Sequence, residues 1–457
     1  MSRAHSIAIA AAILAMTTLT VHADNRSDAN KNSHKKWVAS WTTAPTTTWK
    51  GSTAPALVNF AFPFTAPALP EAHDQTLRMI VKPDLWGNTM RVRLTNTWGT
   101  NAITFGKVMI GLQSFSGATV AGTNTKVTFG GRTFVTLPPG VELWSDPVKL
   151  AWVNDMGDDA VDPTVEGRNL AISVFIPGSS GPMTYHATAL QESFLAAPDT
   201  GDHTADDGDD AFPYETPSWF LVDAVDVMGP GDTRVLVGAG SSSVDGSITT
   251  PGNNDRFLNW MSRFLHAVYG NHVSVVNEGI GGDVAGIPGP GQNRPLTQVL
   301  AERFDRDILG VSGVSDVVFY IGTNDFGDNI PPEQSIASIQ SMVAKLHGLN
   351  INAIGGTLIT DVGQAGTTDA TYAAHNQIND FIRLPGSFDS VADFYNATSD
   401  FSNTDAAGFP ILFPNYATHS DPTGTPDFLH LGRAGAQAEA ETLDLGFFAP
   451  PNGHGHH

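Results

Sequence analysis

The chain has 457 residues, of which 41% are hydrophobic and 15% are charged, so it is too apolar for a disordered protein and long enough for two or three domains. Its 46 Asp and Glu residues against 24 Lys and Arg residues give a formal net charge of −22. A surface this acidic repels nucleic-acid phosphates and anionic membranes, so we expect neither as a partner. The chain has no cysteine, which excludes disulfides, thiolate metal sites and cysteine nucleophiles.

The first 23 residues have the pattern of a secretory signal peptide. A basic Arg3 precedes an apolar run from Ile7 to Met16, and the segment ends with the small-x-small triplet Val21-His22-Ala23. The alternative is a membrane anchor, but an anchor needs roughly 20 uninterrupted apolar residues and this run is shorter. We therefore expect cleavage near Ala23 and an exported protein, extracellular or periplasmic, with residues 24–36 as a flexible leader.

Residues 37–229 are expected to form a β-rich, sandwich-like domain. Short stretches in which apolar and polar residues alternate are separated by Gly, Pro, Asn and Thr, a pattern typical of antiparallel strands with one buried and one exposed face. The segments with this character are 76–82, 90–95, 103–112, 126–129, 133–137, 170–176 and 219–227.

Residues 230–448 show a different periodicity. Continuous apolar runs at 235–237, 273–276, 317–321, 353–358 and 391–394 predict buried strands, and segments with helical periodicity, such as 257–268 and 336–346, lie between them. Alternating strands and helices predict a parallel sheet with helices on both faces, and the functional loops of such a sheet follow the carboxyl ends of its strands.

Four segments of this second half carry side chains suited to catalysis. Three follow predicted strands (Gly238–Gly246, Asn277–Asp283 and Gly322–Asp325), and the fourth is Asp427–His430 near the C-terminus. Taken singly, each is more often a turn, a cap or a surface ion pair. Together they supply a serine, a base, an acid and N–H donors for an oxyanion, which are the parts that nucleophilic ester cleavage requires.

At these residues the sequence resembles the SGNH, or GDSL, hydrolase family, over about residues 233–443. The resemblance implies a flavodoxin-like three-layer α/β/α domain with a parallel sheet. It makes Ser242 the nucleophile, Asp427 and His430 the acid and the base, and the Ser242 N–H, Gly282 and Asn324 the oxyanion-hole donors. The first half is similar to the β-rich N-terminal region of the xylan-esterase-like branch, through Trp37-Val38-Ala39-Ser40-Trp41, Arg91-Val92-Arg93-Leu94-Thr95-Asn96 and Gly201-Asp202-His203-Thr204.

One position departs from the family pattern. The usual Gly-Asp-Ser-Ile-Thr-Asp-Gly is here Gly240-Ser241-Ser242-Ser243-Val244-Asp245-Gly246, so a serine replaces the aspartate before the nucleophile. Gly240 on one side and Asp245-Gly246 on the other keep Ser242 in register. The missing carboxylate leaves a rival interpretation open, a secreted carbohydrate-binding or adhesion protein whose hydrolase domain has decayed.

The expected activity is hydrolysis of a carboxylic ester through an acyl-enzyme, a reaction that needs no cofactor and no metal. The resemblance to the xylan-esterase-like branch favours short acyl groups, such as acetyl, on a carbohydrate or a small ester. A polyester or lipid ester is the alternative, and a neutral polysaccharide is the polymeric partner that an acidic protein would not repel. Oligomeric state is left open.

Three other features have less specific explanations. The aspartate-rich segment 199–210 lacks the spacing of a calcium loop and is expected to be solvated, and the His-containing tail 449–457 is expected to be disordered rather than metal-binding. Trp41, Trp86 and Trp98 are expected to pack in the core or at strand edges rather than to form a sugar-stacking platform.

Overall fold

The computed structural model describes residues 34–47, 71–289, 298–364, 367–417 and 427–449. The expected signal peptide (1–23), most of the expected leader and nearly all of the His-containing tail lie outside these residues. None of the helices in the described part of the chain has the length and hydropathy that crossing a bilayer requires. Residues 34–457 form one compact unit, which is described below.

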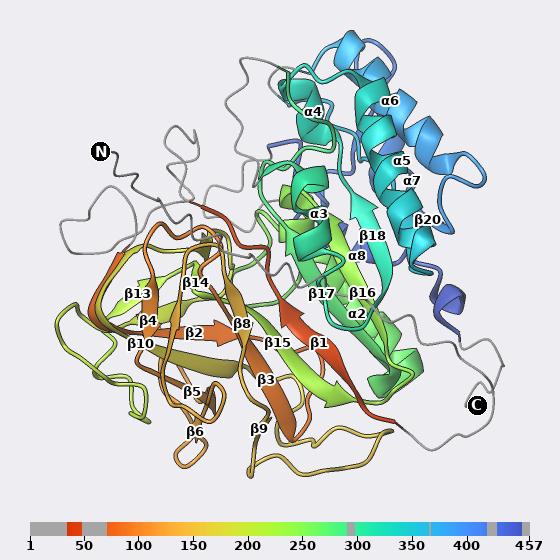
Figure 1. Cartoon of the computed structure of the whole chain (residues 1–457). Coiled ribbons are helices and arrows are strands. Elements are labelled where there is room, and N and C mark those ends of the chain that lie inside the picture. Colours follow the sequence, from red (N-terminus) through yellow and green to blue (C-terminus); the bar gives the residue numbers. More distant parts are fainter. Residues whose placement is uncertain (1–33, 48–70, 290–297, 365–366, 418–426, 450–457) are drawn as a thin grey trace, which may run out of the picture. The chain divides into compact units, whose positions relative to one another are not determined.

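The first half is built from antiparallel sheets, as the alternation predicts (Figure 1). One five-stranded sheet has the order β1-β15-β3-β8, with β9 also paired to β3; its strands are β1 Lys36–Thr42, β15 Val222–Gly229, β3 Thr89–Thr95, β8 Glu142–Trp144 and β9 Val148–Lys149. A six-stranded sheet has the order β13-β12-β2-β10-β5-β6; its strands are β13 Tyr214–Thr216, β12 Ser193–Leu195, β2 Glu71–Val81, β10 Leu170–Pro182, β5 Lys107–Leu112 and β6 Thr125–Lys126. Two short pairs complete the region: β4 Ile103–Phe105 with β7 Val135–Leu137, and β11 Tyr185–His186 with β14 Trp219–Phe220.

The expectation that each strand exposes one face is wrong for β2. Leu77, Met79 and Val81 are buried, but so are Arg78 and Ile80 on the opposite face. The aspartate-rich segment covers that face: the Arg78 guanidinium donates to the carbonyl oxygens of Asp206 (2.7 Å) and Gly208 (3.3 Å) and lies 4.1 Å from the centre of the Phe212 ring. The segment is therefore not simply solvated, because its backbone binds a buried arginine.

The second half contains a five-stranded parallel sheet of order β17-β16-β18-β19-β20. In chain order this is 2-1-3-4-5, the flavodoxin-like order, so the predicted fold class is confirmed. The strands are β16 Arg234–Gly240, β17 Val273–Gly279, β18 Val314–Tyr320, β19 Asn352–Gly356 and β20 Ser390–Ala392. The order reverses between β16 and β18, and β16 is followed directly by Ser241 and Ser242.

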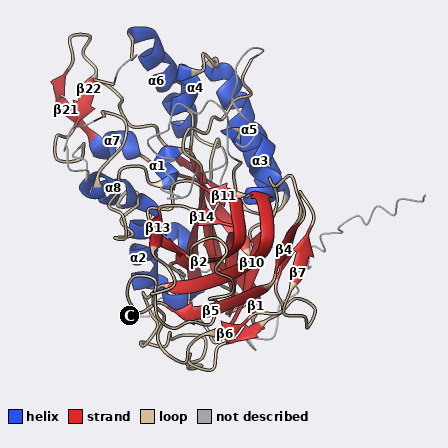
Figure 2. Cartoon of the chain, turned by 90° about the vertical axis from the view of Figure 1, so that its left-hand side faces the viewer, coloured by secondary structure: helices blue, strands red, loops and turns tan. Residues whose placement is uncertain are grey.

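Helices pack on this sheet in two groups, and in Figure 2 most of them lie above the strands of the β-rich region. One group contains α2 Phe257–Tyr269, α7 Phe394–Thr398 and α8 Arg433–Ala440; the other contains α3 Leu300–Asp307, α5 Pro332–Gly348 and α6 Asp369–Arg383. Shorter elements are α1 Ser242–Asp245, α4 Thr323–Gly327, two 3₁₀ turns (Gly270–His272 and Leu445–Phe448) and the hairpin β21 Ser399–Thr404 with β22 Pro410–Leu412. α1 and α4 follow β16 and β18, at the carboxyl edge of the sheet.

The two halves meet where β1 lies against β17, the edge strand of the parallel sheet (Figure 1). The Ser274 hydroxyl donates to the Ala39 carbonyl oxygen at 2.6 Å, and the Ala39 N–H donates to the Ser312 carbonyl oxygen at 2.9 Å. Apolar side chains of both halves belong to one continuous core. The boundaries 37–229 and 230–448 stay a prediction; the last strand of the β-rich region ends at Gly229 and the first parallel strand begins at Arg234.

Candidate active site

Ser242 lies at the start of α1, on a sharp turn after β16. A side chain at Gly240 would place its Cβ 2.1 Å from the Tyr320 carbonyl oxygen, so only glycine allows the strand to run this close to its neighbour. The turn is closed by Asp245 N–H donating to the Ser241 carbonyl oxygen at 2.9 Å and Gly246 N–H donating to the Ser242 carbonyl oxygen at 2.8 Å. The second bond ends α1 after one turn, with Gly246 in the left-handed region at φ 98°.

The structure brings Ser242, His430 and Asp427 together in one hydrogen-bonded line. The Ser242 Oγ lies 2.7 Å from His430 Nε2, and His430 Nδ1 lies 2.6 Å from Asp427 Oδ2. The Leu429 and His430 N–H groups both donate to Asp427 Oδ1 at 2.9 Å. The backbone of residues 429 and 430 therefore holds the carboxylate, and the carboxylate holds the imidazole, as expected for residues three apart on one turn.

These contacts also keep Asp427 ionised. Burial alone would raise the pKa of Asp427, but the hydrogen bonds and charge of His430 and the two N–H donors outweigh it and hold that pKa well below its usual range. An ionised Asp427 can only accept, so His430 Nδ1 carries a proton, and in the neutral ring Nε2 is the nitrogen whose lone pair faces the Ser242 hydroxyl. This is the tautomer that a general base needs.

The neighbouring serines have other surroundings. Ser241 is 5% exposed, and within the described residues its side chain makes no hydrogen bond. The Ser243 hydroxyl interacts with the buried Tyr320 hydroxyl instead of with His430. Of the three adjacent serines, Ser242 is the one that His430 contacts.

The other two predicted residues belong to the loops that follow β17 and β18. Gly282 adopts a positive φ of 83°. Asn324 lies in the first turn of α4, and its side-chain Nδ2 donates to the Asp283 carbonyl oxygen at 2.9 Å. The adjacent Asp325 is fully buried and accepts from the N–H groups of Ala285 (3.0 Å) and Gly286 (2.8 Å). The α4 turn thus fixes the loop on which Gly282 lies.

A buried ionic cluster supports that loop from below. The Arg303 guanidinium on α3 donates to Asp283 Oδ2 at 2.6 and 3.0 Å, to Asp307 Oδ2 at 3.2 Å and to the Gly240 carbonyl oxygen at 3.2 Å. Burial raises the pKa of Asp283 to about 7 although Arg303 lowers it. Arg303 therefore joins the end of β16 to the Gly282 loop, and the aspartate at 283 has a structural partner.

Three residues of this machinery were not singled out by the sequence: His186, Arg256 and Arg303. In the sequence Asp245 indicates only the register of the nucleophile segment. In the structure its carboxylate contacts His186 and Gly281, and its carbonyl oxygen accepts from Arg256 Nε at 2.5 Å. An arginine in an amphipathic helix and a histidine in a β-rich segment carry no local sequence signal for such contacts.

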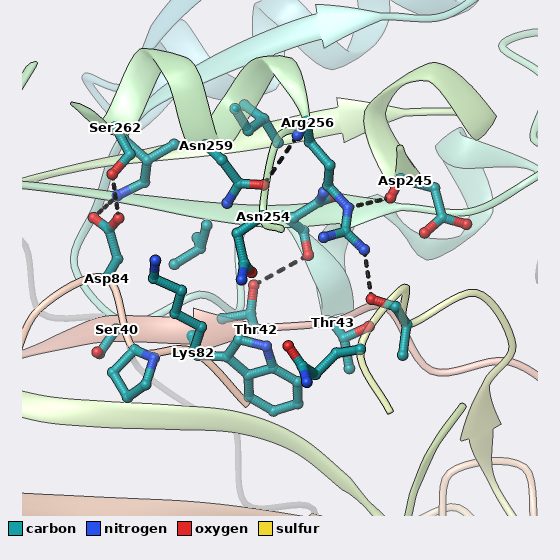
Figure 3. A pocket seen from close by; sticks show the side chains of 18 of the residues that line it. Ser40, Thr42, Thr43, Lys82, Asp84, Asp245, Asn254, Arg256, Asn259 and Ser262 are labelled. Atoms are coloured by element: carbon teal, nitrogen blue, oxygen red, sulfur yellow. Dashed lines mark hydrogen bonds between the residues drawn. The ribbon is translucent and has the colours of Figure 1, made fainter. Parts of the chain in front are cut away.

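A polar pocket of about 100 Å³ lies behind the nucleophile turn, between β1, the end of β2 and the start of α2 (Figure 3). Asp245 and Arg256 form one wall, and Lys82 points into the pocket, where burial and the neighbouring charge of Arg263 lower the pKa of Lys82. Trp41 and Trp219 also line it and pack edge to face, with ring centres 4.9 Å apart. Trp41 and Trp86 are buried, as expected, and the Trp98 Nε1 donates to the Pro45 carbonyl oxygen at 2.9 Å.

Residues 239–438 match the GDSL-like Lipase/Acylhydrolase family. The C-terminal half is therefore similar to a GDSL-like acylhydrolase domain. The match begins inside β16 and ends inside α8, so it includes every residue of the Ser242–His430–Asp427 line and both predicted oxyanion residues. This match supports a carboxylic ester hydrolase.

Several solved structures are similar to part of the chain, each covering 46% of it. They include a lipolytic protein of the G-D-S-L family from Desulfitobacterium hafniense (18% identity, 96% of that chain, TM-score 0.33), a carbohydrate acetylesterase family member from Sinorhizobium meliloti (14%, 95%, 0.33) and an acetylxylan esterase from Geobacillus stearothermophilus (16%, 92%, 0.32). Likenesses this distant do not indicate a substrate. Among curated proteins, no relative matches the sequence.

Proposed function

We propose that this protein is a serine esterase in which Ser242, His430 and Asp427 are the nucleophile, the base and the orienting acid. The observation that carries the proposal is the continuous line from Ser242 Oγ through both ring nitrogens of His430 to Asp427, at 2.7 and 2.6 Å. In a domain that has lost its activity, selection would not maintain the contacts of His430 with Ser242 and Asp427. The rival of a purely carbohydrate-binding protein is therefore the weaker one.

The reaction follows from the positions of these atoms. His430 Nε2 takes the proton from Ser242 Oγ as that oxygen attacks the ester carbonyl carbon, and the resulting tetrahedral oxyanion needs N–H donors. The predicted donors are the Ser242 and Gly282 N–H groups and Asn324, whose amide has a second N–H besides the one bonded to Asp283. Collapse of this intermediate breaks the C–O bond of the ester, and His430 returns the proton to the departing alcohol.

The acyl-enzyme is then hydrolysed by the same groups. A water molecule gives its proton to His430 Nε2 and attacks the acyl carbon, and the second tetrahedral intermediate releases the carboxylic acid and restores the Ser242 hydroxyl. Asp427 stays ionised throughout and stabilises the imidazolium that forms twice in each cycle.

The substrate that we propose is a short acyl ester, such as acetyl, on a carbohydrate or on a small alcohol. The support is the resemblance of the first half to the xylan-esterase-like branch, together with an acidic surface that a neutral polysaccharide would meet without repulsion. We also propose that the protein is exported and cleaved near Ala23, on the pattern of residues 1–23.

The first test is hydrolysis of p-nitrophenyl acetate and butyrate by the full chain and by Ser242→Ala, with Ser241→Ala and Ser243→Ala as matched controls. We expect turnover to be lost only in Ser242→Ala. An inert parent, or a Ser242→Ala variant as active as the parent, would overturn the proposal. Release of acetate from acetylated xylan, and the N-terminal sequence of the secreted protein, then test the substrate and the cleavage site.

A further inference from the structure

His186 connects the β-rich region to the turn that carries Ser242. It lies on the short strand β11, is only 4% exposed, and its ring is 5.7 Å from the ring of Trp219. Its Nδ1 lies 2.9 Å from the Ala44 carbonyl oxygen, and its Nε2 lies 3.0 Å from Asp245 Oδ1. One histidine of the first half thus reaches a carboxylate three residues after the nucleophile.

The partners of His186 require a proton on each side of the ring. The Ala44 carbonyl oxygen can only accept, so Nδ1 carries a hydrogen. A neutral ring would then present the Nε2 lone pair to an ionised carboxylate, and two acceptors cannot bond. A hydrogen must therefore lie between Nε2 and Asp245 Oδ1, and a buried contact of this kind is sensitive to loss of one partner.

Asp245 passes this restraint to both sides of the reaction centre. Its Oδ2 accepts from the Gly281 N–H at 3.1 Å, one residue before Gly282, and its own N–H closes the turn around Ser242. Its carbonyl oxygen accepts from Arg256 Nε, while Arg256 Nη2 donates to the Ala189 carbonyl oxygen at 2.6 Å, again in the β-rich region. The nucleophile turn and the Gly282 loop are therefore held by contacts with the first half of the chain, and Figure 3 shows the bond between Arg256 and Asp245.

We propose that His186 is a positioning residue for catalysis, and that the β-rich region is in this way part of the catalytic unit. It acts through Asp245, which keeps Ser242 and the Gly282 loop at a fixed separation. This inference rests on the proposed esterase function. Because oxyanion stabilisation depends on placement of donors to within a fraction of an ångström, loss of the restraint should reduce kcat rather than raise KM.

The chain offers a matched control in His266. It makes the same kind of contact across the same two regions: Nε2 lies 2.9 Å from Asp84 Oδ2, and Nδ1 lies 2.7 Å from the Gly270 carbonyl oxygen. Neither partner of His266 contacts the nucleophile turn or the Gly282 loop. A variant of His266 therefore weakens the association of the two regions without touching the restraint on Asp245.

The experiment compares His186→Leu with His266→Leu in the full chain, and uses His186→Gln, which keeps an N–H for Asp245, as the conservative variant. On p-nitrophenyl acetate we expect His186→Leu to lower kcat by about 10- to 100-fold with KM within about threefold, and His186→Gln to recover part of the loss. We expect His266→Leu to keep kcat within about threefold of the parent. Equal loss of kcat in both leucine variants, or unchanged kcat in a folded His186→Leu, would overturn the proposal.

A second readout does not depend on activity. Amide hydrogen exchange of the peptide covering residues 277–284 should become faster in His186→Leu and stay unchanged in His266→Leu, because only the former releases the bond from Gly281 to Asp245. If the parent is inert while exchange changes as stated, the esterase function fails and the restraint stands. If the parent is active and exchange does not change, the positioning role is wrong.

Discussion

Glu439 on α8 is a buried carboxyl whose titration should dominate part of the dependence of stability on pH. It is 3% exposed, accepts one hydrogen bond from the Tyr320 hydroxyl at 2.9 Å, and forms no ion pair within the described residues. Burial raises the pKa of Glu439 to about 8, against 4.5 for an ordinary glutamate, although the bond from Tyr320 lowers it. The folded protein thus binds a proton at neutral pH that the unfolded chain releases.

The sign and size of the effect follow from linkage. A raised pKa in the folded state contributes stability that is complete below pH 4.5 and is lost as the pH rises to about 8. The loss is about 1.4 kcal/mol per pH unit, so about 3 kcal/mol disappears between pH 5 and pH 7. In Glu439→Gln the carbonyl oxygen still accepts from Tyr320 and nothing titrates, so the variant should gain about 3 kcal/mol relative to the parent over this range.

The measurement is urea-induced unfolding of the parent and of Glu439→Gln at pH 5, 6 and 7, taken as the difference between the two at each pH. The difference removes every other group that titrates in both proteins. Glu441→Gln is the matched control for the Glu-to-Gln change itself, because Glu441 is exposed and bonded only to Gln437 among the described residues. A Glu439→Gln difference that does not change with pH would refute the burial argument.

Three further outcomes are expected. Asp427→Asn should lower kcat on p-nitrophenyl acetate by on the order of 10³- to 10⁴-fold with little change in KM, because an amide N–H facing His430 Nδ1 favours the wrong tautomer; a loss below tenfold would contradict the assigned role. Arg303→Met should lower the free energy of unfolding by about 3 to 5 kcal/mol, measured in urea, because Asp283 and Asp307 lose their shared cation; a change under 1 kcal/mol would show that the carboxylates do not need it. Gly240→Ala should lower the melting temperature, because the added methyl group clashes with the Tyr320 carbonyl oxygen at a cost of about 2 kcal/mol. Gly348→Ala should leave the melting temperature unchanged, because its methyl group meets open space. Equal melting temperatures of the two variants would contradict the close approach of β16 to β18 at Gly240.

The parallel sheet and the main site could be predicted because both depend on chain order. Buried strands followed by helices give few possible arrangements, and parallel strands bring their carboxyl ends to one edge. Ser242 follows β16 and Asn324 follows β18, so their proximity needed no knowledge of side-chain packing. Asp427 and His430 are three apart on one turn, and their contact is also local.

The β-rich region was less predictable because its burial depends on segments distant in sequence. Arg78 has the alternating position of an exposed residue on β2, and it is buried because carbonyl oxygens of residues 206 and 208 fold over it. His186 shows the same limitation for the site: its partners, Ala44 and Asp245, lie 142 and 59 residues away. No periodicity or spacing near His186 reports either contact.

The nucleophile turn is held by contacts of Val244 and Asp245, and the side chain of Ser241 does not contribute to them. An aspartate before the nucleophile would bring a carboxylate to a position that is 5% exposed and has no hydrogen-bond partner for the serine side chain among the described residues. The restraints on this turn come instead from the other side: the Asn277 amide donates to the Val244 carbonyl oxygen at 2.7 Å, and Arg256, His186 and Gly281 all bond to Asp245. Rigidity of the turn therefore does not require a charge at position 241. If that is right, Ser241→Asp should leave kcat within about threefold of the parent, whereas Asp245→Asn should lower it by at least the factor found for His186→Leu, and a large gain in Ser241→Asp would show that the lost carboxylate limits the reaction.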